Sequence, residues 1–177
     1  MLKLFYPYEY VDSVFLIDYQ KLYDKGYKAI IFDIDNTLVH HGDGSTKEVD
    51  KLFKRIQEIG FKTLLLSNNN ETRIKKFITN IDTPYIANAQ KPTKNGYFKA
   101  MELLNVKKEE TIFVGDQIFT DILGANRCGI PNILVKFIRL PNETKIGKRR
   151  KLENIILSLY NNNKSYQHRM GNVKKEE

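Results

Sequence analysis

The sequence predicts an α/β fold, a doubly wound parallel sheet of about five strands with helices on both faces. Short apolar runs alternate along the chain with segments whose apolar residues recur at helical spacing. Most of the apolar runs end in a cluster of polar residues, which is where an open α/β sheet holds its ligands. With 177 residues, 41% of them hydrophobic, the chain can bury one substantial core, and no break in composition marks a second domain.

The predicted elements follow one another in a regular order after an aromatic N-terminal segment. Residues 1–27 are rich in Tyr and Phe, and we expect a helical lead-in there that packs against the sheet. Residues 28–160 would form the main domain, and the polar, basic residues 161–177 a disordered tail. The predicted strands are 29–32, 63–66, a short one near 86–87, 111–114 and 132–135. The predicted helices are 49–59, 71–79, 120–127 and 152–160.

Two carboxylates stand directly after the first predicted strand, in the string FDIDNTL at residues 32–38. Asp33 and Asp35 could divide the work of phosphoryl transfer, because one can stay ionised and attack phosphorus while the other carries a proton for the departing oxygen. A calcium-binding loop needs Gly at its sixth position and Glu at its twelfth, where this chain has Leu38 and Gly44, so we set that interpretation aside. Taken alone, the string could equally be a polar turn after a strand.

Three further polar clusters follow later strands. Ser67 and Asn68 come after the second, where a hydroxyl and the amides of a helix start can bind phosphate oxygens. Lys91 follows the third and offers a cation to offset phosphoryl charge. Asp116 and Asp121 follow the fourth and supply more carboxylates for a divalent metal. A site of oxygen ligands alone favours magnesium.

Each cluster also has a purely structural explanation, since Ser67 could cap a helix, Lys91 could be a solvated lysine and Asp116 could belong to an ordinary turn. Their occurrence together and in this order is far more specific. The set resembles the four signature motifs of the haloacid dehalogenase superfamily of aspartyl-phosphate phosphohydrolases, over residues ~28 to ~136. The resemblance implies a haloacid dehalogenase-like fold. An aspartate at position 35 is typical of the phosphatase-type members, so a hydrolase is favoured.

The resemblance also implies roles for the four aspartates. Asp33 would be the nucleophile and a magnesium ligand. Asp35 would act first as general acid and then as general base, and would bind magnesium through its backbone carbonyl. Asp116 would bind the metal directly, and Asp121 directly or through water.

The same resemblance implies a set of residues around the phosphate. Ser67 and Lys91 would hold the transferring phosphoryl group. Asn68 is a weaker candidate for a phosphate contact. Apart from the resemblance, the position of Thr37 after the two aspartates makes it a candidate at the phosphate site that would orient the loop by side-chain hydrogen bonding.

Substrate choice in that superfamily is usually governed by an inserted cap domain. The segments from Asp33 to Ser67 and from Ser67 to Lys91 are each filled largely by one predicted helix, so the chain resembles the capless members. An open site favours phosphates on proteins, nucleic acids or lipids over small metabolites. An oligomeric partner could still supply a lid.

Longer strings carry a finer resemblance. DIDNTLV at 33–39, LSNN at 66–69 and GDQIFTDILGAN at 115–126 are similar to the mitochondrial phosphatidylglycerophosphate phosphatase family and its bacterial counterparts, as are the pair at 144–145 and the basic stretch after it. This resemblance implies removal of the terminal phosphate from phosphatidylglycerophosphate. The open alternative is the same chemistry on a soluble phosphoester, a nucleotide or a phosphoprotein.

Positive charge is concentrated near the C-terminus. Residues 136–177 hold 11 Lys or Arg against 4 Glu, so they contribute +7 of the net +8. This region could attract an anionic membrane or RNA, or could simply be a solvated helix face. A non-catalytic RNA- or ribosome-binding protein is therefore a third hypothesis, against which the intact motif set argues. The densest basic patch is Lys145, Lys148, Arg149, Arg150 and Lys151.

The remaining signals bear on location and metal. Cys128 is the one cysteine, so no intramolecular disulfide is possible, and the chain shows neither a secretory leader nor an apolar run of membrane-spanning length. We expect a cytoplasmic protein, with peripheral contact at the inner face of the membrane if the basic patch binds lipid. His40 and His41 have no ligand partners at metal-binding spacing and predict a polar loop at the site mouth, where His40 could touch substrate.

Overall fold

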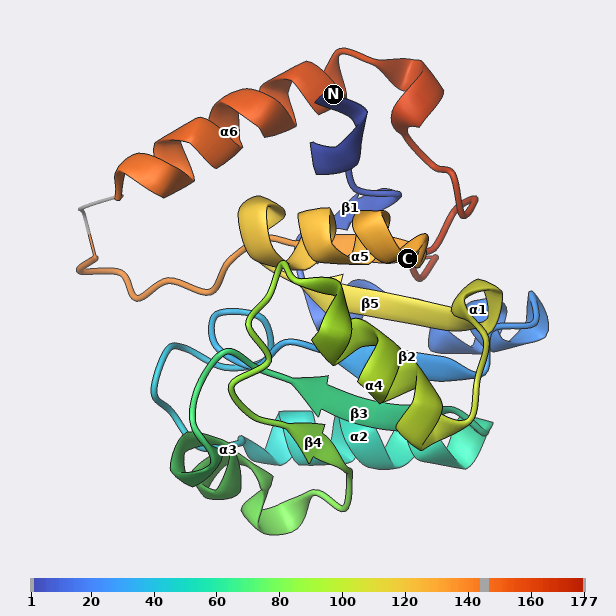
Figure 1. The fold of residues 1–177 in the computed structure, drawn as a ribbon, viewed down its shortest axis with the longest axis vertical. Helices are drawn as coiled ribbons and strands as arrows, with labels where there is room; N and C mark the ends of the chain where they lie inside the picture. Colours follow the sequence, from blue (N-terminus) through green and yellow to red (C-terminus); the bar gives the residue numbers. More distant parts are fainter. Residues whose placement is uncertain (1, 144–146, 177) are drawn as a thin grey trace.

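The structure, a computed structural model, describes residues 2–143 and 147–176. Thr144 and Lys145, part of the C-terminal resemblance, lie outside the described residues. Within them the chain forms one sheet of six parallel strands in the order β1-β6-β5-β2-β3-β4, flanked by helices (Figure 1). The strands are β1 (Glu9–Val11), β2 (Ala29–Phe32), β3 (Lys62–Leu66), β4 (Tyr85–Ile86), β5 (Thr111–Gly115) and β6 (Asn132–Val135). The predicted α/β class with a parallel sheet is confirmed.

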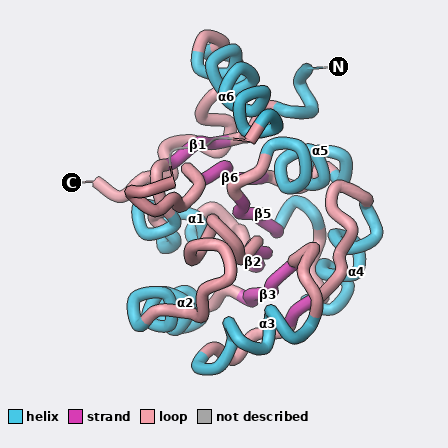
Figure 2. Tube along the Cα trace, turned by 90° about the vertical axis from the view of Figure 1, so that its left-hand side faces the viewer, coloured by secondary structure: helices cyan, strands magenta, loops and turns pink. Residues whose placement is uncertain are grey.

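Helices cover both faces of the sheet, as a doubly wound fold requires (Figure 2). In β2 the alternation of side chains decides which face each residue serves: Ile30 and Phe32 join the core under α1, α2 and α3, and Ile31 joins the core under α4 and α5. Both faces of the central strands are thus buried. The helices are α1 (Tyr19–Asp24), α2 (Lys47–Ile59), α3 (Glu71–Phe77), α4 (Lys94–Leu104), α5 (Leu123–Cys128) and α6 (Lys148–Asn161).

Local sequence signals explain where α2 begins and ends. The Thr46 hydroxyl accepts a hydrogen bond from the Val49 amide at 3.3 Å and caps the first turn. Gly60, at φ +119°, ends the helix in the left-handed conformation that favours glycine. Between these signals the residues predicted from helical spacing, among them Phe53 and Ile56, are buried against β2 and β3.

The two chain ends differ from expectation. Residues 1–27 contain short helices but also β1, which pairs with β6 and adds a sixth strand to the about five predicted. Residues 161–176, expected to be disordered, are packed: Met170 and Val173 are buried, and the Val173 carbonyl accepts a hydrogen bond from the Asp18 amide at 2.8 Å. Polar contacts with the N-terminal segment accompany these two apolar side chains, among them the bond from the Met170 amide to Glu9 Oε1 at 3.0 Å.

The last helix, α6, lies at the β1 end of the sheet, away from β4 (Figures 1 and 2). Its inner face buries Glu153 and Tyr160. Its outer face leaves Leu152, Ile155 and Leu159 exposed at 54%, 58% and 45%. None of the helices in the described part of the chain combines the length and apolar character needed to cross a membrane.

Candidate active site

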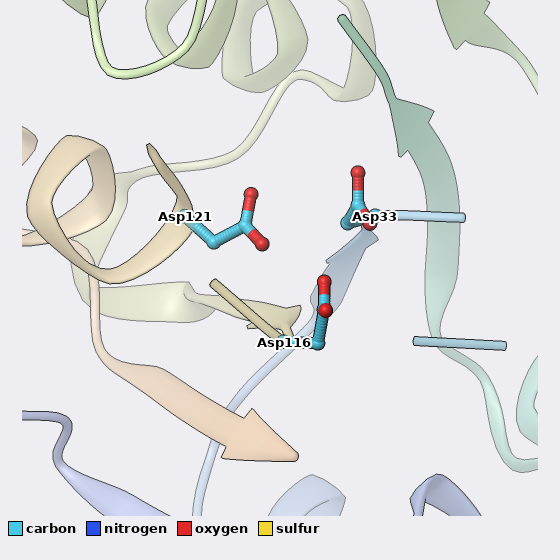
Figure 3. A group of neighbouring side chains, drawn as sticks. All are labelled: Asp33, Asp116 and Asp121. Atoms are coloured by element: carbon cyan, nitrogen blue, oxygen red, sulfur yellow. The ribbon is translucent and has the colours of Figure 1, made fainter. Parts of the chain in front are cut away.

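Three aspartates converge at the carboxyl ends of neighbouring strands. Asp33 follows β2 and Asp116 follows β5, and these strands are in register, with Phe32 opposite Val114. Asp121 comes from η5 (Ile118–Ile122), a π-helical turn between β5 and α5. One carboxylate oxygen from each aspartate lies within 4.8 Å of the others, and the three carboxyl groups are buried (Figure 3). The structure therefore brings together the side chains that the sequence predicted as a metal site.

Lys91 joins this cluster from the loop after β4. Its Nζ donates to Asp33 Oδ1 at 2.6 Å and to Asp121 Oδ1 at 2.7 Å, and its side chain is only 2% exposed. The Asn68 side chain holds the Lys91 backbone on both sides, accepting from the amide at 2.7 Å and donating to the carbonyl at 3.1 Å. Asn68, predicted as a weak phosphate contact, thus positions Lys91 while also lining the active-site cavity.

Three residues position Asp121 in the cluster. A Cβ at Gly115 would lie 2.5 Å from Asp121 Oδ2, so only glycine leaves room for this carboxylate. The buried Tyr97 hydroxyl lies 3.0 Å from the Thr120 carbonyl oxygen and 3.1 Å from that of Asp121, where it donates to the π-helical turn. The Gln117 amide donates to Asp121 Oδ2 at 3.0 Å. These contacts fix the carboxylate against β5.

Thr37 links two of the aspartates. Its Oγ1 lies 3.2 Å from Asp33 Oδ2 and 3.2 Å from Asp116 Oδ1. Asn36, just before it, has φ +62°, a left-handed conformation that turns the loop back over β2. Thr37, predicted to orient the loop, thus has its hydroxyl in contact with two carboxylates of the cluster.

Asp35 lines the same cavity but is not part of the three-aspartate cluster and has its own partners. Arg73, on α3, donates from Nε at 3.2 Å and from Nη2 at 2.6 Å to Asp35 Oδ1, and Asn69 Nδ2 donates to Oδ2. The Gly42 amide adds a bond of 2.9 Å to Oδ1. The two carboxylates of the first motif thus have different partners, Lys91 for Asp33 and Arg73 for Asp35.

Arg73 and Asn69 were not predicted as site residues. Both follow the Ser67 strand end, and the start of α3 at Glu71 brings Arg73 back over the site within its first turn. The short distance along the chain from Ser67 to Arg73 indicated that Arg73 could reach the site. Its partner, Asp35, could not be predicted, because the contact depends on the path of the loop that carries Asp35. Arg73 Nη1 is buried and has no hydrogen-bond partner among the described residues.

Ser67 lies deeper than the other residues. It is fully buried at the end of β3, and its Oγ accepts from the Asn69 amide at 3.1 Å. A cavity of about 220 Å³ opens above, lined by Asp33, Asp35, Asn68, Asn69, Lys91 and Asp121 among others. Ser67 is not among the described residues that line this cavity. The Asn69 side chain also donates to the Ser67 Oγ, from Nδ2 at 3.3 Å, so this oxygen is the acceptor in both contacts with Asn69.

Arg150 enters the site from α6. It forms an ion pair with the Asp116 carboxylate and donates from Nη1 to the Asp116 carbonyl oxygen at 2.7 Å and to Glu153 Oε2 at 2.9 Å. Its guanidinium stacks on the Phe137 ring, 4.6 Å from the centroid. The sequence showed Arg150 only as one member of a basic patch. Its contact with Asp116 depends on how α6 docks, and no local pattern reports that.

Comparisons with known proteins show which family the chain belongs to. A family model described as haloacid dehalogenase-like hydrolase matches residues 42–129. The chain is 40% identical over 134 residues to "Probable phosphatase YqeG" of Bacillus subtilis strain 168, a match that covers 75% of this chain and 78% of that protein.

The chain belongs to the haloacid dehalogenase-like hydrolases.

A more distant relative and two solved structures are also similar to the chain. "Glyceraldehyde 3-phosphate phosphatase" of Pyrococcus furiosus is 26% identical over 49% of this chain and 40% of its own length, so the match spans less than half of that relative. The cobalt-bound deoxy-D-mannose-octulosonate 8-phosphate phosphatase of Haemophilus influenzae superposes with a TM-score of 0.52 at 18% identity, covering 80% of this chain and 92% of that one. An uncharacterized protein from Listeria monocytogenes serotype 4b gives 0.53 at 21% identity, covering 76% and 99%. These structures share the fold.

The family model begins after the first motif of this hydrolase. Its matched range starts at residue 42 and leaves Asp33 and Asp35 outside. The roles proposed for these two aspartates therefore rest on the geometry described above and on the resemblance of the motif itself.

Burial controls the electrostatics of the cluster. It raises the pKa of Asp33 from 3.8 to about 6, against the opposing effect of Lys91, and the neighbouring Asp121 raises it further. It raises the pKa of Asp116 from 3.8 to about 8, with Asp33 and Asp121 adding to the effect and Arg150 opposing it. Three buried carboxylates share two nearby cations, Lys91 and Arg150. Another positive charge at the cluster would favour the ionised forms.

The donor set fits magnesium. The three side chains offer only carboxylate oxygens, which hard divalent cations prefer, and their mutual spacing allows one ion to touch all three. No histidine or cysteine joins them in the described part of the chain. Manganese accepts the same oxygen ligands.

The pKa shifts predict how the metal-free hydrolase responds to pH. Asp33 and Asp116 hold protons more tightly when folded than when unfolded, so folding takes up protons and stability should fall as pH rises from the ordinary pKa of 3.8 to about 8. Thermal unfolding in chelator across this range measures the slope. Asp116→Asn should flatten it, and saturating magnesium should remove or reverse it. A metal-free midpoint that stays constant or rises with pH would contradict the proton uptake.

Proposed function

We propose that this hydrolase is a magnesium-dependent phosphomonoester phosphatase that works through an aspartyl-phosphate on Asp33. The observation that carries the proposal is the cluster of Asp33, Asp116 and Asp121, in which Lys91 Nζ bonds both Asp33 and Asp121, with Asp35 paired separately with Arg73. A nucleophile, a charge-neutralising group and an acid are what a phosphate monoester needs.

In the first half-reaction, the Asp33 carboxylate attacks phosphorus and the bond from phosphorus to the alcohol oxygen breaks. Asp35 gives its proton to the departing oxygen. Lys91 and the Ser67 hydroxyl hold the phosphoryl oxygens as charge builds on them. A magnesium ion held by Asp33, Asp116 and Asp121, and by the Asp35 carbonyl, would neutralise phosphoryl charge.

In the second half-reaction, a water molecule attacks the same phosphorus and Asp35 now takes its proton. The bond between phosphorus and Asp33 breaks, which frees inorganic phosphate and restores the carboxylate. Asn69 and Arg73 keep Asp35 oriented through both steps. The same side chain thus acts as acid and as base because the proton it gives away is returned by water.

For the substrate we propose a lipid phosphate, phosphatidylglycerophosphate. The support is the likeness of the three motif strings to the phosphatidylglycerophosphate phosphatases and the short connections around the site. Only α2 lies between Asp33 and β3, and only α3 with a short turn lies between Ser67 and β4. A soluble phosphoester remains the competing substrate, and the name of the Pyrococcus relative, a glyceraldehyde 3-phosphate phosphatase, is an example of one.

Phosphate release from phosphatidylglycerophosphate in mixed micelles tests this proposal. We expect turnover that needs magnesium, stops in chelator and exceeds turnover of p-nitrophenyl phosphate in kcat/KM. Turnover of the aryl phosphate alone would keep the phosphatase and remove the lipid. No turnover of either, together with salt-sensitive RNA binding that persists in Asp33→Asn, would favour the non-catalytic RNA-binding alternative.

The outer face of α6 makes a second prediction for a lipid substrate. The exposed apolar stripe of α6 is flanked by exposed basic residues, and we expect it to bind anionic vesicles. Replacing Lys148, Arg149 and Lys151 with Gln should weaken sedimentation with such vesicles on the order of 10²-fold, at about 1 kcal/mol for each charge. Arg150 is left intact because it contacts Asp116.

A matched control removes the same charge from α2, where Lys51, Lys54 and Arg55 are also exposed. That triple Gln variant should bind vesicles like the wild type. Equal binding by both triple variants would contradict a membrane role for α6.

A further inference from the structure

The two oxygens of the Asp116 carboxylate have different partners. Oδ1 lies 3.2 Å from Thr37 Oγ1, which lies at the same distance from Asp33 Oδ2. Oδ2 forms an ion pair with Arg150 Nη2, while Nη1 of the same guanidinium donates to the Asp116 carbonyl oxygen at 2.7 Å. The arginine thus bonds the side chain and the main chain of one residue at once, which fixes the carboxylate relative to its own backbone.

The Thr37 side of the Asp116 carboxylate is the side left for a metal ion. A hydroxyl has one proton, so Thr37 can donate to Asp33 Oδ2 or to Asp116 Oδ1 but not to both. Oδ2 of Asp116, by contrast, has a charged donor of its own in Arg150. An ion held by the three aspartates would therefore meet Asp116 through Oδ1 alone for as long as the arginine stays in place.

Glu153, one turn further along α6, holds Arg150 in place and offsets its charge. Its Oε2 accepts from Arg150 Nη1 at 2.9 Å, and both side chains are largely buried. Its Oε1 accepts from the Phe119 amide at 3.2 Å, in the π-helical turn that carries Asp121. A lone arginine would repel a divalent cation. The pair of Arg150 and Glu153 has no net charge, so it can hold Asp116 Oδ2 without opposing the ion.

The number of oxygens that a carboxylate offers separates magnesium from calcium. Magnesium requires a near-ideal octahedron of about six ligands at short distance, whereas calcium accepts about six to eight oxygens and often takes both oxygens of one carboxylate. A carboxylate restricted to one oxygen therefore suits magnesium. The same carboxylate with both oxygens free would suit calcium better.

Resting on the proposed magnesium-dependent phosphatase function, we propose that Arg150 and Glu153 are positioning residues that favour magnesium over calcium by holding Asp116 Oδ2 away from the ion. The preference is then set from α6, by side chains that do not touch the metal. Both ions carry the same charge, so loss of the Arg150 charge alone would change both affinities alike. A general loosening of the site would also weaken both. The ratio of the two affinities therefore reports which oxygens Asp116 can offer.

The Kd of each ion, without substrate, is measured from the rise of the thermal-unfolding midpoint with magnesium or calcium concentration. Arg150→Gln should lower the Kd for calcium relative to the Kd for magnesium about tenfold. Glu153→Gln keeps Arg150 but removes the charge that anchors it, and should shift the ratio in the same direction by a smaller factor. This second variant tests the proposal by itself if Arg150→Gln shows no cooperative unfolding in chelator. Arg55→Gln, the same change at an exposed arginine on α2, is the matched control and should keep the wild-type ratio.

The outcomes separate this proposal from the proposed function. A shift toward calcium in the α6 variants, with none in Arg55→Gln, supports the proposal. An unchanged ratio in both α6 variants, whether or not both ions bind more weakly, would overturn it and leave the phosphatase standing, since Arg150 would then only hold α6 to the sheet. If the wild type binds neither ion and releases phosphate from p-nitrophenyl phosphate in chelator, the proposal fails together with the metal dependence of the proposed function.

Discussion

Asp33→Asn is expected to reduce phosphate release on the order of 10⁴-fold or more, because the amide cannot attack phosphorus. The change is nearly isosteric, so the fold should be kept. It also removes a charge that pairs with Lys91 and that would bind magnesium. Initial rates with p-nitrophenyl phosphate in saturating magnesium measure the loss.

Asp24→Asn is the matched control for this variant. Asp24 is exposed at the end of α1 and bonds only Gln20 among the described residues, so its replacement should leave the rate unchanged. Residual activity above a hundredth of the wild type in Asp33→Asn would show that another group attacks phosphorus.

Lys91→Met is expected to combine loss of activity with a large loss of stability in the metal-free protein. Lys91 is the direct ion-pair partner of both Asp33 and Asp121, and all three side chains are buried. Removing it leaves buried carboxylates without their partner, which costs about 3–5 kcal/mol for a buried pair. Urea unfolding in chelator measures the difference from the wild type.

Magnesium should restore part of that stability, because the ion supplies positive charge to the same carboxylates. Lys99→Met, an exposed lysine on α4, is the matched control and should behave like the wild type with and without metal. Equal stability of Lys91→Met and the wild type in chelator would mean that the carboxylates are neutralised without Lys91.

The parts of the site that follow strands could be predicted from the sequence. Asp33, Lys91, Asp116 and Asp121 each come directly after an apolar run or within the next few residues, and parallel strands bring their carboxyl ends to one edge. The order of the motifs was therefore enough to place these side chains together. The parts that depend on one segment docking against another could not be predicted in this way.

Arg150 and β1 are two features that could not be predicted from local sequence. Arg150 reaches Asp116 only because α6 packs across the end of the sheet, and nothing in its local sequence indicates that contact. β1 has three residues, too few for a period-two pattern, and pairs with β6, far along the chain. The tail after α6 shows the same limit, since its composition is polar while the contacts that hold it, such as the bond from the Met170 amide to Glu9 and the burial of Val173, are to the distant N-terminal segment.

The helix α4 escaped prediction for a local reason. Gly96, a poor helix former, lies in its first turn, and its Cβ would lie 3.0 Å from the Ala89 carbonyl oxygen. The glycine thus allows α4 to approach the segment before Lys91 closely. The same helix carries Tyr97, whose hydroxyl holds the turn of Asp121.

Trapping a phosphorylated enzyme tests the central claim most directly. The wild type and Asp33→Asn are mixed with excess p-nitrophenyl phosphate and magnesium, quenched in acid within the first turnover, and measured by intact mass and by borohydride reduction with peptide mapping. We predict one added phosphoryl group in the wild type, reduction of the labelled residue at position 33 to homoserine, and no label in Asp33→Asn. A label at another residue, or steady turnover with no trapped phosphoryl group in either protein, would contradict nucleophilic catalysis by Asp33.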